Sequence, residues 1–274
     1  MNAVSWRRLS IAFAWRPEWP VAVLVGIAWL LLALLSLQGD GGHAAHATGT
    51  ASAQALAMST VTSWSMAWAN APSLLMPWLT SWLLMSFAMM VPATLPAVRH
   101  VALNSIDARR ARAMTIYVVA YLAVWGVFGV VAFALLDVSR TLVGRTPLGF
   151  ATSDRVLLAI ILAIATAWQL TRMKRRAILA CKRTVPLPPD GLRADRACAR
   201  FGMMQAWRCL LACWPLMLLM AAIPHPHPLL PMVALTAIVL IEERARNRDR
   251  LIIPIAVLFA LATAASSLVA IVAR

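Results

Sequence analysis

Residues 115–136 read TIYVVAYLAVWGVFGVVAFALL, an apolar stretch that contains no charged side chain. The hydrocarbon core of a bilayer is crossed by about 20 residues of α-helix, so this stretch has the length of a transmembrane helix. Its apolar residues do not alternate with polar ones, as they do in the strands of a membrane barrel. The stretch therefore predicts a helix whose surroundings are lipid.

Similar apolar runs recur along the whole chain. Hydrophobic residues make up 62% of the sequence, charged residues only 13%, and the mean hydropathy is +0.77. We expect transmembrane helices at about residues 20–38, 77–98, 115–136, 155–171, 205–223, 228–241 and 251–271. Backbone groups in lipid must be bonded within a helix or a closed barrel. The predicted fold is an all-α polytopic bundle of about seven spans, with residues 1–274 forming a single integral membrane domain.

The basic residues predict how this bundle is oriented. The formal net charge is +15, and Lys and Arg collect in alternate connections between the apolar runs. Cytoplasmic connections of membrane proteins carry such an excess. We therefore expect the N-terminus inside, the C-terminus outside, residues 39–75 in the periplasm and residues 172–203 as a basic cytoplasmic loop. The predicted location is the inner membrane of a bacterium, with the lipid bilayer as partner and no nucleic acid.

Two of the runs, 155–171 and 228–241, are short for a span. The second is retained because its loss would place four arginines, from Arg244 to Arg250, on the outer side. We expect TRMKRRAILACKR, residues 171–183, to extend the first of these runs. The following VPLPP stops any helix, because proline lacks the amide donor that a helix needs.

The N-terminal part of the chain leaves two alternatives open. The first run is either an uncleaved anchor or a signal peptide, and its apolar core from Val21 to Leu37 is longer than a typical signal core. We expect an anchor. In the periplasmic segment Ala57, Val61, Trp64 and Trp68 recur at helical spacing, and tryptophan favours the head-group region. This pattern predicts an interfacial helix on the outer leaflet.

Two of the predicted spans carry stripes of sulfur-containing side chains. In the second span Met85 and Met89 share a face, and the prolines that follow them free backbone carbonyls in the preceding turns. In the fifth span Cys209, Cys213, Met217 and Met220 form one stripe. Thiolates and thioethers are the ligands that select Cu(I). The alternative is ordinary packing, since methionine fills gaps in apolar cores and cysteine is often buried.

Histidines lie on the side that we predict to be outside. His43 and His46 are three residues apart, and His225 and His227 alternate with prolines in the sequence PHPHP. Imidazole is a common metal ligand. The competing interpretation is a flexible stretch and a rigid turn whose histidines are simply exposed to solvent.

Three segments together resemble a known family. They are WLLMSFAMMVPATLP (Trp82–Pro96), ACKRTVPLPP (Ala180–Pro189) and FGMMQAWRCLLACWPLML (Phe201–Leu218). The chain resembles, over about residues 60–250, the bacterial family called domain of unknown function 2182, predicted metal-binding integral membrane proteins. The resemblance implies a metal-binding role. Many members carry a further cysteine where this chain has Ala212, which implies a thinner ligand set here.

These observations lead to two hypotheses. The first is a membrane protein that binds or conducts a soft metal, most plausibly copper as Cu(I). Its predicted ligands are Met85, Met89, Cys209, Cys213, Met217, His225 and His227. The second is a non-catalytic accessory or scaffold subunit that packs against another membrane protein or a second copy of itself. An enzyme is not expected, because no phosphate-binding loop, paired catalytic carboxylates or Ser-His-Asp order is present.

Overall fold

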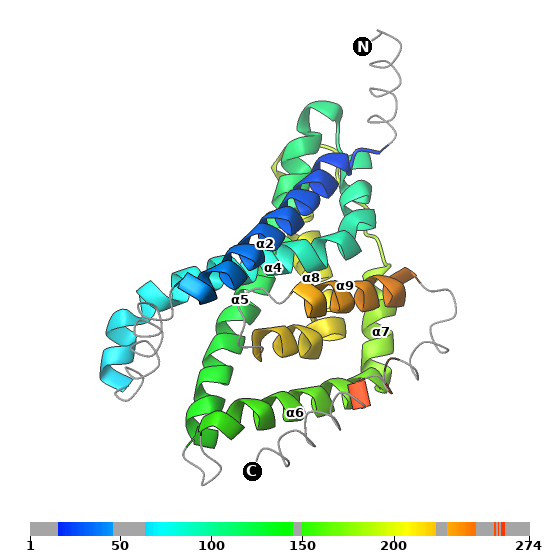
Figure 1. Ribbon diagram of the computed structural model, residues 1–274. Helices are drawn as coiled ribbons and strands as arrows, with labels where there is room; N and C mark the ends of the chain where they lie inside the picture. The colour runs from blue at the N-terminus through cyan, green and yellow to red at the C-terminus, as the bar shows by residue number, and fades with distance from the viewer. Residues whose placement is uncertain are drawn as a thin grey trace.

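The computed structural model describes residues 16–45, 64–144, 150–222 and 229–244, with a few positions between 255 and 260. All regular structure in these segments is helical (Figure 1). The elements are α2 (Trp19–Ala45), α4 (Trp64–Leu103), the short η2 (Asp107–Arg109), α5 (Arg110–Gly144), α6 (Phe150–Gln169), α7 (Arg172–Cys181), α8 (Gly191–Ala222) and α9 (Leu229–Arg244).

Four of these helices contain stretches long and apolar enough to cross a membrane: Trp19–Ser36, Met76–Leu103, Asp107–Ser139 and Gly191–Ala222. A fifth crossing exists if α6 and α7 form one bent span. The all-helical, membrane-compatible architecture is thus confirmed, whereas seven spans are not. Helix α9 has 16 residues, which at 1.5 Å per residue is shorter than a bilayer core. The predicted run 251–271 lies almost entirely outside the described residues.

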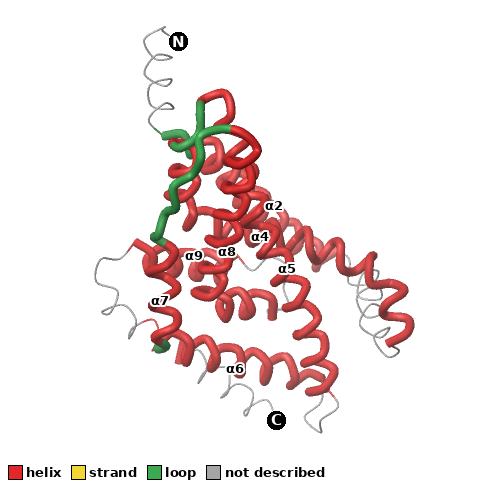
Figure 2. Tube along the Cα trace, turned by 180° about the vertical axis from the view of Figure 1, so that it is seen from behind, coloured by secondary structure: helices red, strands yellow, loops and turns green. Residues whose placement is uncertain are grey.

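The segment 172–203 contains more helix than its sequence suggested. Helix α7 does not extend α6 but turns away from it by 72° at Leu170 and Thr171 (Figure 2). The Thr171 side chain accepts a hydrogen bond from the Lys174 amide, which caps the new helix. The predicted extension is therefore a separate helix. The break at VPLPP is confirmed, since residues 183–190 are not helical and α8 begins at Gly191.

Helix α4 begins earlier than the predicted second span. It runs without interruption from Trp64, so Trp64 and Trp68 belong to the same helix as Met85 and Met89. The earlier residues of the predicted interfacial helix lie outside the described residues. Placement of this segment at the outer leaflet stays a prediction.

Helix α8 is the centre of the packing. It packs most closely against α5 and also contacts α6, α7 and α9, while α5 packs against α4 and α2 runs alongside α4 (Figure 1). Small residues allow helices in membranes to approach closely. At Gly202 of α8 the approach is so close that a Cβ atom would lie 2.5 Å from the Tyr117 carbonyl oxygen of α5. This contact fixes α5 and α8 against each other.

One proline in α4 and the proline in α8 are each matched by a tryptophan on another helix. A proline removes the amide that would bond the carbonyl four residues earlier. For Pro92 that carbonyl belongs to Ala88, and Trp29 Nε1 of α2 donates to it at 2.9 Å. For Pro215 it belongs to Leu211, and Trp168 Nε1 of α6 donates to it at 3.1 Å. Neighbouring helices thus satisfy both carbonyls, as a membrane interior requires.

Candidate metal centre

The predicted stripe on α8 is buried over its whole length. Cys209, Cys213, Met217 and Met220 are each at most 3% exposed. The side chains of Cys209 and Cys213 are within hydrogen-bonding reach of each other, and Cys209 also reaches the Tyr121 hydroxyl of α5. All four cysteines lie in described segments and none forms a disulfide. The structure therefore brings two thiols together in the core.

The predicted stripe on α4 is buried as well. Met85, Met89 and Met90 belong to the same apolar core as the α8 stripe. The Tyr121 hydroxyl of α5 donates to the Met90 carbonyl oxygen at 3.4 Å. Because Tyr121 also reaches Cys209, it lies between the thiol pair and the backbone of the methionine-bearing helix. The two stripes share one core, with α5 packed against both helices.

A buried ion pair lies near the thiol pair. Lys174 Nζ of α7 is 2.8 Å from Glu242 Oε2 of α9, with side-chain exposures of 3% and 9%. Lys174 also donates to Gln169 Oε1 at the end of α6. Its positive charge acts electrostatically on Cys213. The sequence predicted Lys174 in a helical extension of the run 155–171, and it contains no signal that pairs this lysine with a carboxylate on another helix.

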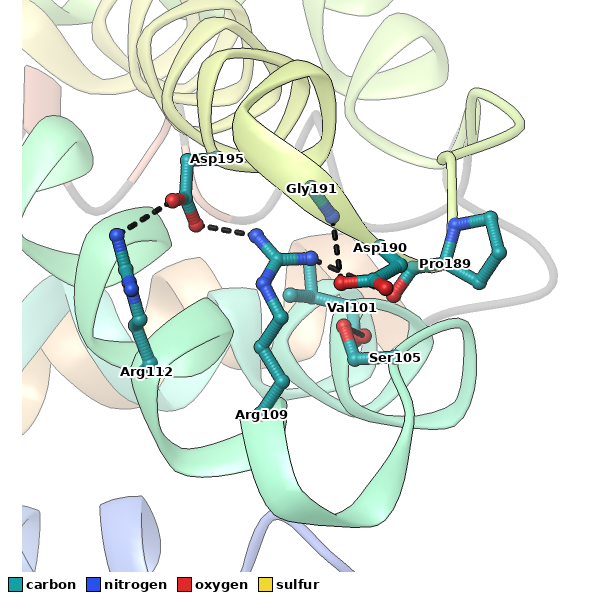
Figure 3. Close-up of polar contacts among 8 residues, drawn as sticks. All are labelled: Val101, Ser105, Arg109, Arg112, Pro189, Asp190, Gly191 and Asp195. Atoms are coloured by element: carbon teal, nitrogen blue, oxygen red, sulfur yellow. Dashed lines mark hydrogen bonds and ion pairs between the residues drawn. The ribbon is translucent and has the colours of Figure 1, made fainter.

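The end of the bundle where α5 and α8 begin, here called the basic face, is held by ion pairs. Arg109 and Arg112 both bond to Asp195 near the start of α8 (Figure 3). Arg109 also donates to the Pro189 carbonyl oxygen at 3.4 Å. His100 Nε2 is 2.9 Å from the Val185 carbonyl oxygen. These contacts fasten the non-helical connection between α7 and α8 across the basic face.

A cavity of about 320 Å³ opens beside this connection. Four elements form its walls: the proline-containing part of α4, the end of α7, the first half of α8 and the end of α9. Cys181, the last residue of α7, and Gln205 of α8 line it. The sequence did not predict this site, because it depends on contacts between residues far apart in the chain. The only signal was a cysteine next to the VPLPP break.

Some predicted ligands are not tested by the structure. His225 and His227 lie outside the described residues, as does the His43 side chain. Among the residues that are described, no group of three or more His, Cys, Asp or Glu side chains is placed to hold a metal ion. The candidate ligand set on α8 differs from such a group, because it contains only two cysteines. Its further soft donors in the stripe are methionine thioethers.

Comparison with known proteins bears on the kind of metal. No curated protein and no solved structure matches the chain. A family model named PpoB2 and described as copper chaperone matches residues 79–266, which include both sulfur stripes. No model of domain of unknown function 2182 matches, although a copper-related family is consistent with the metal-binding role that its resemblance implied. Since the matched residues make up more than half of the sequence, the chain belongs to the PpoB2 copper chaperone family.

Proposed function

We propose that this protein binds Cu(I) inside its helical bundle and passes it on, with Cys209 and Cys213 as the central ligands. The observation that carries the proposal is the contact between two buried thiols in a member of a copper chaperone family. Thiolates select Cu(I) over hard cations such as Mg²⁺ and Ca²⁺. An apolar core also favours a large, weakly hydrated ion of low charge over a divalent one.

The loaded site has one cation near it. Each thiol loses its proton when it binds the metal, so two thiolates and one Cu(I) carry a single negative charge. A buried charge needs a nearby partner of opposite sign. Lys174 acts electrostatically on Cys213 in the sense that favours the thiolate, whereas Glu243 acts in the opposite sense, and Glu242 keeps Lys174 in place. We propose Lys174 as the cation that faces the loaded site.

The remaining sulfurs suit passage more than storage. Met217 follows Cys213 by one helical turn, and Met85 and Met89 face the same core. Neutral thioethers bind Cu(I) without losing a proton, so they release it more easily than thiolates do. We propose these methionines as secondary ligands. His225 and His227 are proposed as the entry ligands on the outer side of a bacterial inner membrane.

The experiment is a competition for Cu(I) between the purified protein in detergent and bathocuproine disulfonate, which changes colour when it binds Cu(I). We expect the wild type to retain Cu(I) in a fixed ratio to the chain. The double variant Cys209→Ser/Cys213→Ser should lose affinity by more than the roughly 10–100-fold that loss of an outer-shell partner causes.

The chain offers a matched control for this variant. Cys198 lies on the same side of α8 and is 1% exposed, but it is 11 residues before Cys209, a rise of about 16 Å. Cys198→Ser removes one buried thiol and should leave Cu(I) binding unchanged. Retention of wild-type affinity by the double variant would show that the thiol pair does not bind the metal.

A further inference from the structure

The face of α8 that carries the thiol pair continues to the cavity at the basic face. Phe201, Gln205, Cys209 and Cys213 are spaced four residues apart and therefore lie on one side of the helix. Phe201 and Gln205 line the cavity. Gln205 precedes Cys209 by one helical turn, a rise of about 6 Å. The wall of the cavity is thus one turn away from the nearer thiol.

Cys181 lies on the cavity wall formed by α7, close to the helical turn of α8 that contains Gln205. Gln205 Nε2 donates to the Cys181 carbonyl oxygen at 2.6 Å, which fixes the end of α7 against α8. Cys181 is partly exposed, whereas the three cysteines of α8 are buried. Tyr117 of α5 interacts electrostatically with both Cys209 and Cys181. Cys181 is therefore the thiol that borders the cavity and is held against the helical turn next to Cys209.

The cavity wall also contains a polar atom that the described part of the chain leaves unsatisfied. Gln205 is 5% exposed, and its Oε1 atom has no hydrogen-bond partner among the described residues. A buried acceptor without a donor costs about 1–3 kcal/mol. Such a wall is suited to receiving a ligand or its bound water.

We propose that this cavity is a transfer site, where Cu(I) passes from the Cys209–Cys213 pair to Cys181 and from there to an anionic thiol-bearing acceptor in solution. The proposal rests on the proposed Cu(I)-binding function and adds the exit route to it. Three cationic side chains at the cavity, Lys182, Arg183 and Arg244, outnumber the one carboxylate, Glu243, and favour an acceptor of negative charge. The basic face, which we predict to be cytoplasmic, is then the side of release.

The transfer is an exchange of ligands without a redox change. The Cys181 thiol loses its proton and its sulfur forms a bond to Cu(I). The bond between Cu(I) and the Cys209 sulfur breaks, and the Cys209 thiolate takes up a proton, which leaves Cu(I) on Cys213 and Cys181. Two thiols of the acceptor then lose their protons and bind Cu(I), while the bonds to Cys213 and Cys181 break and each of these thiolates takes up a proton. The metal remains Cu(I) throughout, and every proton lost by an incoming thiol is matched by one gained by a leaving thiolate. No oxidant or reductant is needed.

The test is the rate at which loaded protein releases Cu(I) to bathocuproine disulfonate, an anionic chelator, in anaerobic stopped-flow mixing. We expect Cys181→Ser to retain as much Cu(I) as the wild type and to release it at least roughly tenfold more slowly. Cys198→Ser is the matched control and should release at the wild-type rate. Release from Cys181→Ser at the wild-type rate would overturn the transfer site.

A second measurement protects the test against a folding defect. In unsubstituted protein, alkylation by a maleimide followed by mass spectrometry reports the reactivity of Cys181 directly. We expect Cys181 to react in the copper-free protein and to react more slowly after Cu(I) loading, because Cu(I) that exchanges between the buried pair and Cys181 occupies its thiolate part of the time. Equal reactivity with and without Cu(I) would contradict the proposal, whatever the variants do.

The two proposals fail in distinguishable ways. If the wild type retains no Cu(I), the proposed function is wrong and the transfer site falls with it. If the wild type retains Cu(I), Cys209→Ser/Cys213→Ser does not, and Cys181→Ser releases normally, only the transfer site is wrong.

Discussion

The interior of the bundle and its basic face satisfy polar groups in different ways. In the interior, two carbonyls freed by prolines each accept a hydrogen bond from a tryptophan on another helix. At the basic face, arginines bond to Asp195 and to backbone carbonyls of the α7–α8 connection. The interior thus uses neutral donors and the face uses charges.

The difference has a consequence for metal binding. Around the thiol pair, the tryptophan indoles of α2 and α6 already donate hydrogen bonds to backbone carbonyls. The hydroxyls of the neighbouring tyrosines are bonded to α4. The charged groups that act electrostatically on Cys213 are Lys174 and, with opposite sign, Glu243. At the basic face an exposed thiol would meet several cations. The comparison predicts that interior contacts contribute much more free energy than contacts on the face.

The largest effect is expected at the buried pair of Lys174 and Glu242. Lys174→Met leaves the carboxylate buried without its partner and should lower the free energy of unfolding by about 3–5 kcal/mol. The measurement is denaturant unfolding in mixed micelles. Adding Glu242→Leu should recover most of the loss, and Arg176→Met, at an exposed position of the same helix, should change little. No recovery in the double variant would show that the pair is not a unit.

The next effect concerns the contact between α5 and α8. Gly202→Ala places a methyl group against the Tyr117 carbonyl oxygen, and because both atoms belong to packed helices, neither can move away easily. We expect a loss of about 3 kcal/mol, at the upper end of typical overpacking costs. Gly26→Ala is the control, since a Cβ there meets nothing within 4 Å. Equal unfolding free energies for the two variants would refute the close approach.

A smaller loss is expected at the proline of α8. Trp168→Phe removes the donor to the Leu211 carbonyl and should cost about 2 kcal/mol, because the acceptor is left unsatisfied. Pro215→Ala restores the amide that would bond this carbonyl within the helix. The same tryptophan substitution should therefore cost clearly less in the Pro215→Ala background. A double-mutant cycle of unfolding free energies measures the coupling.

The smallest effect is expected on the basic face. The Arg112 side chain is 64% exposed and that of Arg109 is 10% exposed, although both bond to Asp195. Arg112→Ala should lower the free energy of unfolding by less than about 1 kcal/mol, as for other exposed ion pairs. Arg109→Ala should cost more, since it also loses the bond to Pro189. The comparison of interior and face is contradicted if Arg112→Ala costs more than Trp168→Phe.

Helical periodicity explains which features were predictable. Apolar length predicted helices at six of the seven runs, and the four-residue spacing of Cys209, Cys213 and Met217 predicted one buried stripe. The bend at Thr171 was not predicted, because no proline or glycine stands there. The ion pair of Lys174 and the place of Cys181 beside Gln205 depend on which helices pack together. A single sequence carries no pattern for such pairings.

Trp168 bonds to Leu211, which is 43 residues away in the sequence, and Pro215 is 47 residues from Trp168. Only the fold brings Trp168 and Pro215 into one interaction. Within the PpoB2 family, a relative that has exchanged the proline for an ordinary residue no longer needs an indole on the facing helix. Selection should then relax at the tryptophan position. The two residues are expected to be kept or lost as a pair during the evolution of the family, so aligned relatives should show correlated substitution at these two sites.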